Sequence, residues 1–77
     1  MKQVLVIDES SLFRDYISSK LGEFGIETAV AINAMEGISK IRSLAPDLII
    51  LDYHLGRQGY MEVLKQKKAD INGNIIV

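Results

Sequence analysis

The sequence predicts an α/β fold built on a parallel sheet, and three observations support that prediction. Two short apolar runs, residues 4–7 and 48–51, are continuous rather than alternating, which is typical of strands buried on both faces of a sheet. Segments in which apolar residues recur at helical spacing separate the expected strands. Strands that alternate with helices indicate right-handed parallel crossovers. The expected order of elements is therefore βαβαβαβ, with the two continuous runs adjacent and central.

The first expected strand, residues 4–7, ends at Asp8, and a helix follows it. Ser10 or Ser11 can cap that helix, because a serine hydroxyl accepts hydrogen bonds from backbone N–H groups of the first turn. Gly25 is a suitable residue just beyond the end of the helix. The aromatic residues of this segment recur at helical spacing, and we expect them in the core: Phe13, Tyr16 and Phe24.

The second expected strand, residues 26–32, is weaker and partly alternating, which favours an edge position. Asn33, with Glu36 three residues later, has the spacing of a capping box and predicts the start of the second helix. Pro46 ends that helix, because proline disfavours helical geometry in the residue before it. The apolar stripe of the helix consists of Ile38, Ile41 and Leu44.

The third expected strand, residues 48–51, ends at Asp52, and a glycine-containing loop follows at residues 56–59. A short helix is expected over residues 60–68, with three residues directed inward: Met61, Val63 and Leu64. The sequence Asn72-Gly73-Asn74 is a turn signal, and residues 75–77 begin a fourth strand.

Composition narrows the possible functions. A chain of 77 residues with a net charge of −1 holds one small domain and has no basic excess that would favour nucleic acid. The absence of cysteine excludes disulfides and thiolate metal sites. No apolar stretch approaches the ~20 residues of a membrane span, and the first apolar run is too short for a signal peptide. We therefore expect a cytoplasmic protein without a membrane or a direct nucleic-acid partner.

Three carboxylates follow the two central strands. In open parallel sheets, ligands bind beyond the carboxyl ends of the strands, and Asp8, Glu9 and Asp52 are expected at that edge. Such a cluster of negative charge favours a hard divalent cation, and Mg²⁺ prefers oxygen ligands of this kind. An ionised aspartate beside that cation can act as a nucleophile towards a phosphoryl group.

Two motifs at this separation resemble those of the response-regulator receiver domain of two-component signalling. The first is Val4-Leu5-Val6-Ile7-Asp8-Glu9-Ser10, and the second is Pro46-Asp47-Leu48-Ile49-Ile50-Leu51-Asp52. Arg14 and the segment Glu36-Gly37-Ile38 also fit the family pattern. The resemblance implies a partial flavodoxin-like (CheY-like) α/β sheet with strand order 2-1-3-4. Residues 1–77 would form the N-terminal portion of a single receiver domain.

The resemblance also implies a function and a site. Asp52 would accept a phosphoryl group from a sensor histidine kinase, and the module would not be an enzyme in the turnover sense. Mg²⁺ would be held by Asp8, Glu9, Asp52 and the backbone carbonyl of His54. The sequence departs from the family at Gly56, where proline is common, and at Gly59, which stands one residue before the expected position. It also lacks the later hydroxyl residue and lysine that contact the phosphoryl group in the family.

These departures from the family pattern leave an alternative function open. The chain would then be a truncated or engineered receiver fragment that acts only as a non-phosphorylated interaction module. The fourth strand, residues 75–77, would present an open edge, so we expect a homo-oligomer formed through it. The side chain of His54 is expected in solvent, and Ser10 and Ser11 are expected as helix caps rather than nucleophiles.

Overall fold

A four-stranded parallel sheet with helices on both faces forms the molecule in its computed structural model, which describes residues 3–69 and 74–76. The elements in chain order are β1 (Gln3–Ile7), α1 (Ser11–Gly22), β2 (Glu27–Ala31), α2 (Ala34–Leu44), β3 (Leu48–Leu51), the 3₁₀ turn η1 (Tyr53–Leu55), α3 (Arg57–Ala69) and β4 (Asn74–Ile76). The strand order β2-β1-β3-β4, with every pairing parallel, confirms the predicted flavodoxin-like topology. Asn72, Gly73 and Val77, which belong to the predicted turn and last strand, lie outside the described residues.

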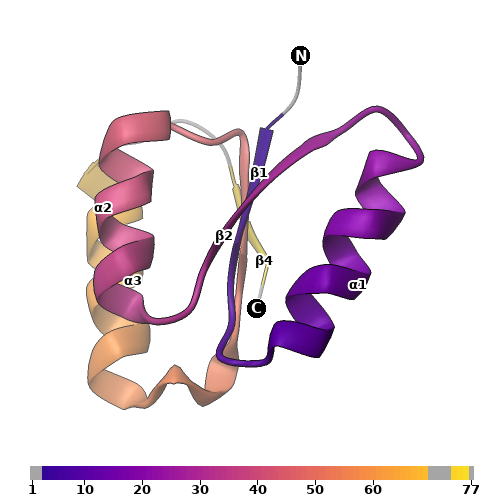
Figure 1. The fold of residues 1–77 in the computed structure, drawn as a ribbon. Helices are drawn as coiled ribbons and strands as arrows, with labels where there is room; N and C mark the ends of the chain where they lie inside the picture. The colour runs from indigo at the N-terminus through magenta and orange to yellow at the C-terminus, as the bar shows by residue number, and fades with distance from the viewer. Residues whose placement is uncertain (1–2, 70–73, 77) are drawn as a thin grey trace.

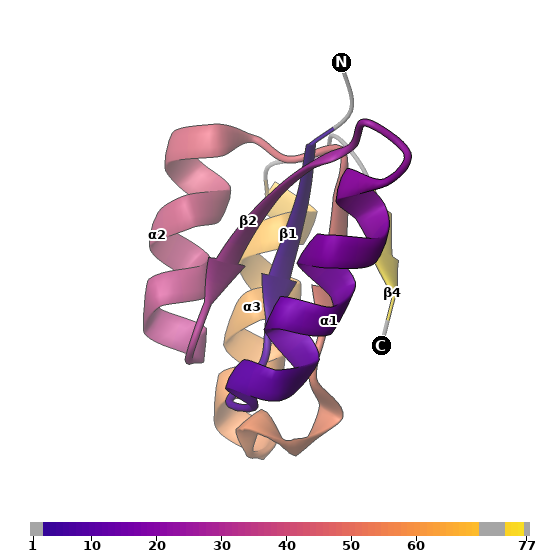
Figure 2. The same cartoon turned by 45° about the vertical axis from the view of Figure 1, so that its right-hand side comes forward.

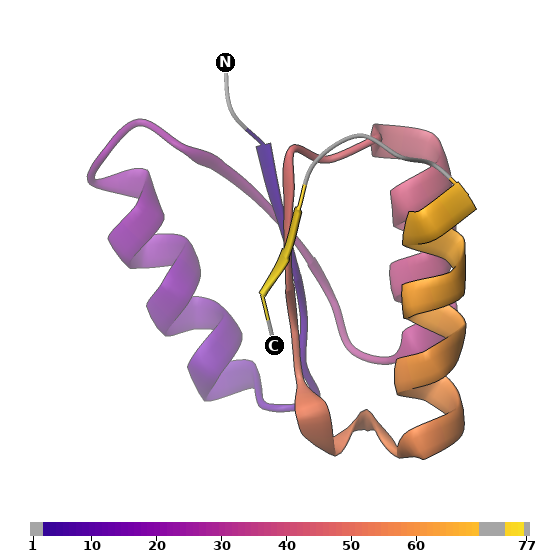
Figure 3. The ribbon, with the colours of Figure 1, turned by 180° about the vertical axis from the view of Figure 1, so that it is seen from behind.

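The two faces of the sheet are covered unequally. Figure 1 shows the sheet nearly edge-on, with α2 and α3 together on one side and α1 alone on the other. The view from behind in Figure 3 shows the same division, with β4 at the outer edge of the sheet. Within the described ranges, every helix falls short of the length and apolar character that crossing a bilayer requires.

The main core lies between the sheet and the α2–α3 layer. It is built from seven buried residues: Leu5, Ile7, Ala31, Ile41, Ile49, Leu51 and Val63. Strand β1 is also buried on its other face, because Val4 and Val6 are almost fully covered. The predicted central position and two-sided burial of β1 are therefore confirmed.

Strand β3 departs from the prediction of burial on both faces. Ile49 and Leu51 are buried, but the alternate residues Leu48 and Ile50 are only half-buried. The reason is the placement of α1, which packs against β2 and β1 and leaves the same face of β3 less covered (Figure 2).

The aromatic residues predicted in the core around α1 are not there. Tyr16 is 57% exposed, Phe24 is 79% exposed and Phe13 is 37% exposed. No residue of α1 is fully buried. Among the described residues, α1 is the one helix on that face, so no second helix covers its flanks. Phe24 also lies beyond the last residue of α1, where the chain turns back towards β2.

The helix ends follow the sequence signals. Gly25 has a φ of 73° and closes α1 through two hydrogen bonds, Gly25 N–H to Gly22 O and Ile26 N–H to Leu21 O, both of 3.0 Å. This pattern is the Schellman motif that glycine favours. Helix α2 ends at Leu44, and Ala45 takes a left-handed conformation with a φ of 46° just before Pro46.

Helix α3 begins earlier than predicted. It starts at Arg57 rather than residue 60, because Gly56 makes the turn with a φ of 89° and its carbonyl already accepts the N–H of Tyr60. Val63 is buried and Leu64 packs against the core as predicted, whereas Met61 is 44% exposed. Gly59 lies within the first turn of α3, which explains the position of this glycine: a Cβ there would lie 3.1 Å from the Cβ of Ala34 on α2.

Gly37 in α2 generates the first prediction. A Cβ at this position would lie 2.5 Å from Cδ1 and 2.9 Å from Cγ1 of Ile7, which is fully buried, so either that side chain or the helix would have to shift. We expect Gly37→Ala to lower the free energy of unfolding by about 1–2 kcal/mol, because overpacking outweighs the better helix propensity of alanine. Gly22→Ala is the matched control, since nothing lies within 4 Å of a Cβ there. Urea unfolding of both variants checks this, and equal stability of the two would refute the tight α2–β1 contact.

Candidate functional site

The pairing of β1 with β3 brings two aspartates to the same edge of the sheet. Ile7 is in register with Leu51, so Asp8 and Asp52 are the next residues on neighbouring strands. The N–H of Asp52 donates to the carbonyl of Ile7 at 2.9 Å, which extends the ladder to the first residue beyond β3. Neighbouring strands lie about 4.8 Å apart, so the two aspartates leave the sheet side by side. The predicted juxtaposition of these residues at one edge therefore holds at the level of the backbone.

Asp8 is held in the turn between β1 and α1. Its N–H donates to the carbonyl of Ala31 at 3.0 Å, and its Oδ1 accepts the N–H of Ser10 at 2.8 Å. Ser10 is the N-cap of α1, and its hydroxyl accepts the N–H of Phe13, as predicted for a capping serine. The carboxylate of Asp8 is thus oriented by the same residue that starts the helix.

Asp52 is held in a similar way at the end of β3. Its Oδ1 accepts the N–H of His54 at 2.9 Å, so it caps the short turn η1. Its side chain is only 16% exposed, although it is a charged group at a loop. The His54 side chain is 87% exposed, as predicted, and its Nδ1 lies 3.5 Å from the same oxygen of Asp52.

Glu9 is the third acid that the sequence predicts at this edge of the sheet. Glu9 follows Asp8 directly and is exposed. Among the described residues, no three acidic, histidine or cysteine side chains are arranged to hold a metal ion. The backbone thus gathers the acids at one edge, while the side chains of Asp8 and Asp52 each turn towards a local backbone N–H.

Arg14 is the residue at this edge whose role the sequence did not reveal. Its Nη1 donates to the carbonyl of Asp8 at 2.6 Å, in a half-buried position. The sequence signal for this contact is that Arg14 lies four residues after the N-cap Ser10. Helical side chains lean towards the N-terminus of their helix, so the guanidinium can reach back to Asp8. Arg14 therefore places one positive charge behind the acidic edge and fixes the backbone of Asp8.

These features define what the edge can do chemically. It offers carboxylate oxygens and backbone carbonyls, which are hard ligands suited to a cation such as Mg²⁺. Asp52 is a mostly buried carboxylate at a strand end, and an ionised carboxylate can act as a nucleophile.

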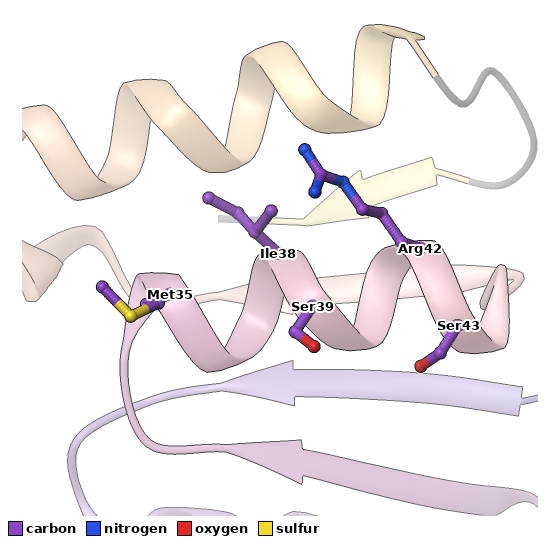
Figure 4. A pocket seen from close by; sticks show the side chains of 5 residues that line it. All are labelled: Met35, Ile38, Ser39, Arg42 and Ser43. Carbon is purple, nitrogen blue, oxygen red and sulfur yellow. The ribbon is translucent and has the colours of Figure 1, made fainter.

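A separate hollow of about 450 Å³ runs along the surface of α2. Its lining residues are Met35, Ile38, Ser39, Arg42 and Ser43 (Figure 4). The guanidinium of Arg42 reaches towards α3, where its Nε and Nη2 donate to Oε1 of Gln66. None of the acids of the sheet edge lines this hollow, so it is not part of the candidate site.

Several known proteins are similar to this chain in sequence. The chain is 30% identical to the chemotaxis protein CheY of Thermotoga maritima over 78 residues, which covers 99% of this chain and 65% of that protein. It is 41% identical over 69 residues to a protein-glutamate methylesterase/protein-glutamine glutaminase of Geobacter sulfurreducens. The match covers 87% of this chain but only 19% of that protein, so the chain spans about a fifth of the length of such relatives. No protein-family model matches the chain.

Solved structures agree with these relatives. The crystal structure of the response regulator TrrA from Thermotoga maritima, in complex with Mg²⁺-BeF, aligns with a TM-score of 0.87 and 32% identity. The alignment covers all of this chain and 68% of that one. Both kinds of comparison therefore lead to the same group of signalling proteins.

The cap at Ser10 generates a prediction about the turn that carries Asp8. Ser10→Ala removes the hydroxyl that accepts from Phe13, and we expect it to lower the free energy of unfolding by about 1 kcal/mol. Ser11→Ala is the control, because Ser11 is the first residue within the helix, and we expect its effect to stay within about 0.5 kcal/mol. Thermal unfolding of both variants measures the difference. A similar loss for the two serines would contradict the capping role.

Proposed function

Because the chain belongs to the response-regulator receiver family, we propose that it acts in the cytoplasm, where Asp52 accepts a phosphoryl group from the phosphohistidine of a sensor histidine kinase. The observation that carries the proposal is the position of Asp52, mostly buried at the end of β3 and directly beside Asp8 at the end of β1. In this reaction a carboxylate oxygen of Asp52 attacks the phosphorus, a new P–O bond forms, and the histidine nitrogen leaves with the electron pair of the broken bond.

We propose that residues 1–77 correspond to the N-terminal portion of a single receiver domain. The alignment with TrrA, which covers this whole chain and 68% of that protein, supports this assignment. The similarity to the methylesterases extends over only about a fifth of those proteins, so their activity is not carried over to this chain. The proposed role is that of a phosphoacceptor module rather than a turnover enzyme.

Mg²⁺ belongs to the same proposal. Asp8, Glu9, Asp52 and the backbone carbonyl of His54 would hold it, and this donor set fits a hard cation because it consists only of oxygen atoms at one sheet edge. Asp8 and Asp52 accept their local N–H groups through Oδ1, so the second oxygen of each carboxylate takes no part in those bonds. When bound, the cation supplies positive charge next to the transferring oxygens.

The other residues of the edge orient the acceptor and its neighbour. The N–H of His54 fixes the carboxylate of Asp52, and Arg14 fixes the backbone of Asp8. Burial of Asp52 keeps water away from most of its surface. These contacts hold the two acids in place before any ligand arrives.

Phosphorylation by a small donor tests this function. With acetyl phosphate and Mg²⁺, we expect intact-mass spectrometry to show one added phosphoryl group, and we expect its loss in Asp52→Asn and on removal of Mg²⁺ by chelation. Asp47→Asn is the matched control, because Asp47 precedes the same strand at the opposite edge, where it accepts the N–H of Gln3. A folded protein that remains unmodified, or modification that persists in Asp52→Asn, would refute the proposal.

The edge position of β4 favours a second candidate role, self-association. In the described sheet β4 pairs with β3 alone, so the outer side of its backbone is open to another strand. We expect a second copy of the chain to pair there, and light scattering at micromolar concentration to give a mass above that of the monomer whether or not Mg²⁺ is present. A monodisperse monomer would count against this role.

A further inference from the structure

The outer edge of β2 carries two backbone groups that a neighbouring strand would normally engage. Among the described strands, β2 pairs with β1 alone, and the hydrogen bond from Asp8 N–H to the carbonyl of Ala31 shows that Ala31 faces β1. Backbone groups alternate in direction along a strand, so those of Val30 and Ile32 point away from β1. The carbonyl of Val30 and the N–H of Ile32 are thus the acceptor and donor that one residue of an added parallel strand would use.

Two side chains of α2 occupy these groups. Lys40 Nζ donates to the carbonyl of Val30, and Glu36 Oε1 accepts the N–H of Ile32 at 3.1 Å. Glu36 and Lys40 are one helical turn apart, and their charged groups form an ion pair of 3.7 Å. Figure 2 shows how this is possible, since α2 runs alongside β2 at this edge of the sheet.

We infer that Glu36 and Lys40 form an edge clamp, a side-chain substitute for a residue of a neighbouring strand, which blocks β2 from pairing with a second copy of this chain. The ammonium takes the place of a strand N–H, and the carboxylate takes the place of a strand carbonyl. The ion pair holds both groups over the edge and leaves the net charge of the clamp at zero.

The clamp also explains a departure from the predicted capping box. Asn33 caps α2 as predicted, since its Oδ1 accepts the N–H of Glu36 at 2.8 Å. In a capping box, Glu36 would bind in return the N–H of Asn33. It binds instead the N–H of Ile32, one residue earlier, which is the first residue after β2 and continues its outer edge.

Exposed strand edges pair with other chains unless charge, bulges or covering segments prevent it. Here the charged pair acts on the edge itself, because it satisfies the hydrogen bonds that would attract a second strand. The clamp does not depend on the chemistry proposed for Asp52, which follows β3 rather than β2.

The test compares two double variants that remove one acid and one base. Glu36→Ala/Lys40→Ala opens the clamp, and Glu62→Ala/Lys65→Ala removes two exposed charges from α3. Sedimentation velocity at micromolar concentration should show a weight-average mass about twice as large for the clamp variant as for the control. Equal masses for the two variants would overturn the inference.

Amide hydrogen exchange identifies the surface that pairs. In dilute solution, the Ile32 amide of the clamp variant should exchange about tenfold faster than in the parent, because a charge-assisted hydrogen bond is lost. At high concentration the outward-facing amides of Thr28 and Ile32 should become protected. Association without that protection would place the contact elsewhere, for example at β4, and would refute the clamp as the barrier.

A single variant covers the case in which the double variant fails to fold. Lys40→Met keeps the apolar stem and removes the ammonium, which is both the donor to Val30 and the ion-pair partner of Glu36, while Lys40→Arg keeps a positively charged donor. We expect Lys40→Met to raise the mass with the same amide protection, and Lys40→Arg to retain the parent's mass. If both lysine variants behave like the parent, the inference fails.

Discussion

The parallel pairing of β1 with β3 is the constraint on which the rest of the structure depends. Both strands contribute to the core beneath α2 and α3, and this burial specifies the register, because a one-residue slip would turn each side chain of a strand to the other face of the sheet. Because the register pairs Ile7 with Leu51, the aspartates that follow these residues must emerge together. The candidate site is therefore a consequence of core packing, and the acids need no contact with each other to be brought to one edge.

Much of this arrangement could be predicted from continuous apolar runs and the acids that end them. The Ser10 and Asn33 caps, the turn at Gly25 and the central position of β1 and β3 follow from local patterns, whereas the full strand order follows from the family resemblance. Each is present in the structure. The errors have a common cause, since helical spacing identifies the apolar side of a helix but not how much of the fold covers it. Tyr16 and Met61 are exposed for that reason. The direction of the Asp8 carboxylate also depends on competing backbone donors, which periodicity does not reveal.

Helix α2 combines tight packing on one side with edge protection on another. Its inner side approaches β1 so closely that Gly37 leaves no room for a Cβ beside Ile7. This approach sets the helix beside β2 at the height where Glu36 and Lys40 reach the backbone of the edge strand. The close packing at Gly37 and the contacts of Glu36 and Lys40 with the edge strand thus belong to the same placement of α2.

Helix α1 differs from the other helices because none of its residues is fully buried. A helix with no fully buried residue is expected to open locally at a lower free energy than the main core, which lies on the other face of the sheet. Yet α1 supplies Arg14, and its N-cap is Ser10, and these two residues hold Asp8. Undocking of α1 would release the acid at the end of β1, while any ligand that requires Asp8 in place would favour the docked helix. Local order in α1 is thus thermodynamically linked to the position of Asp8, and binding of such a ligand would stabilise the docked helix.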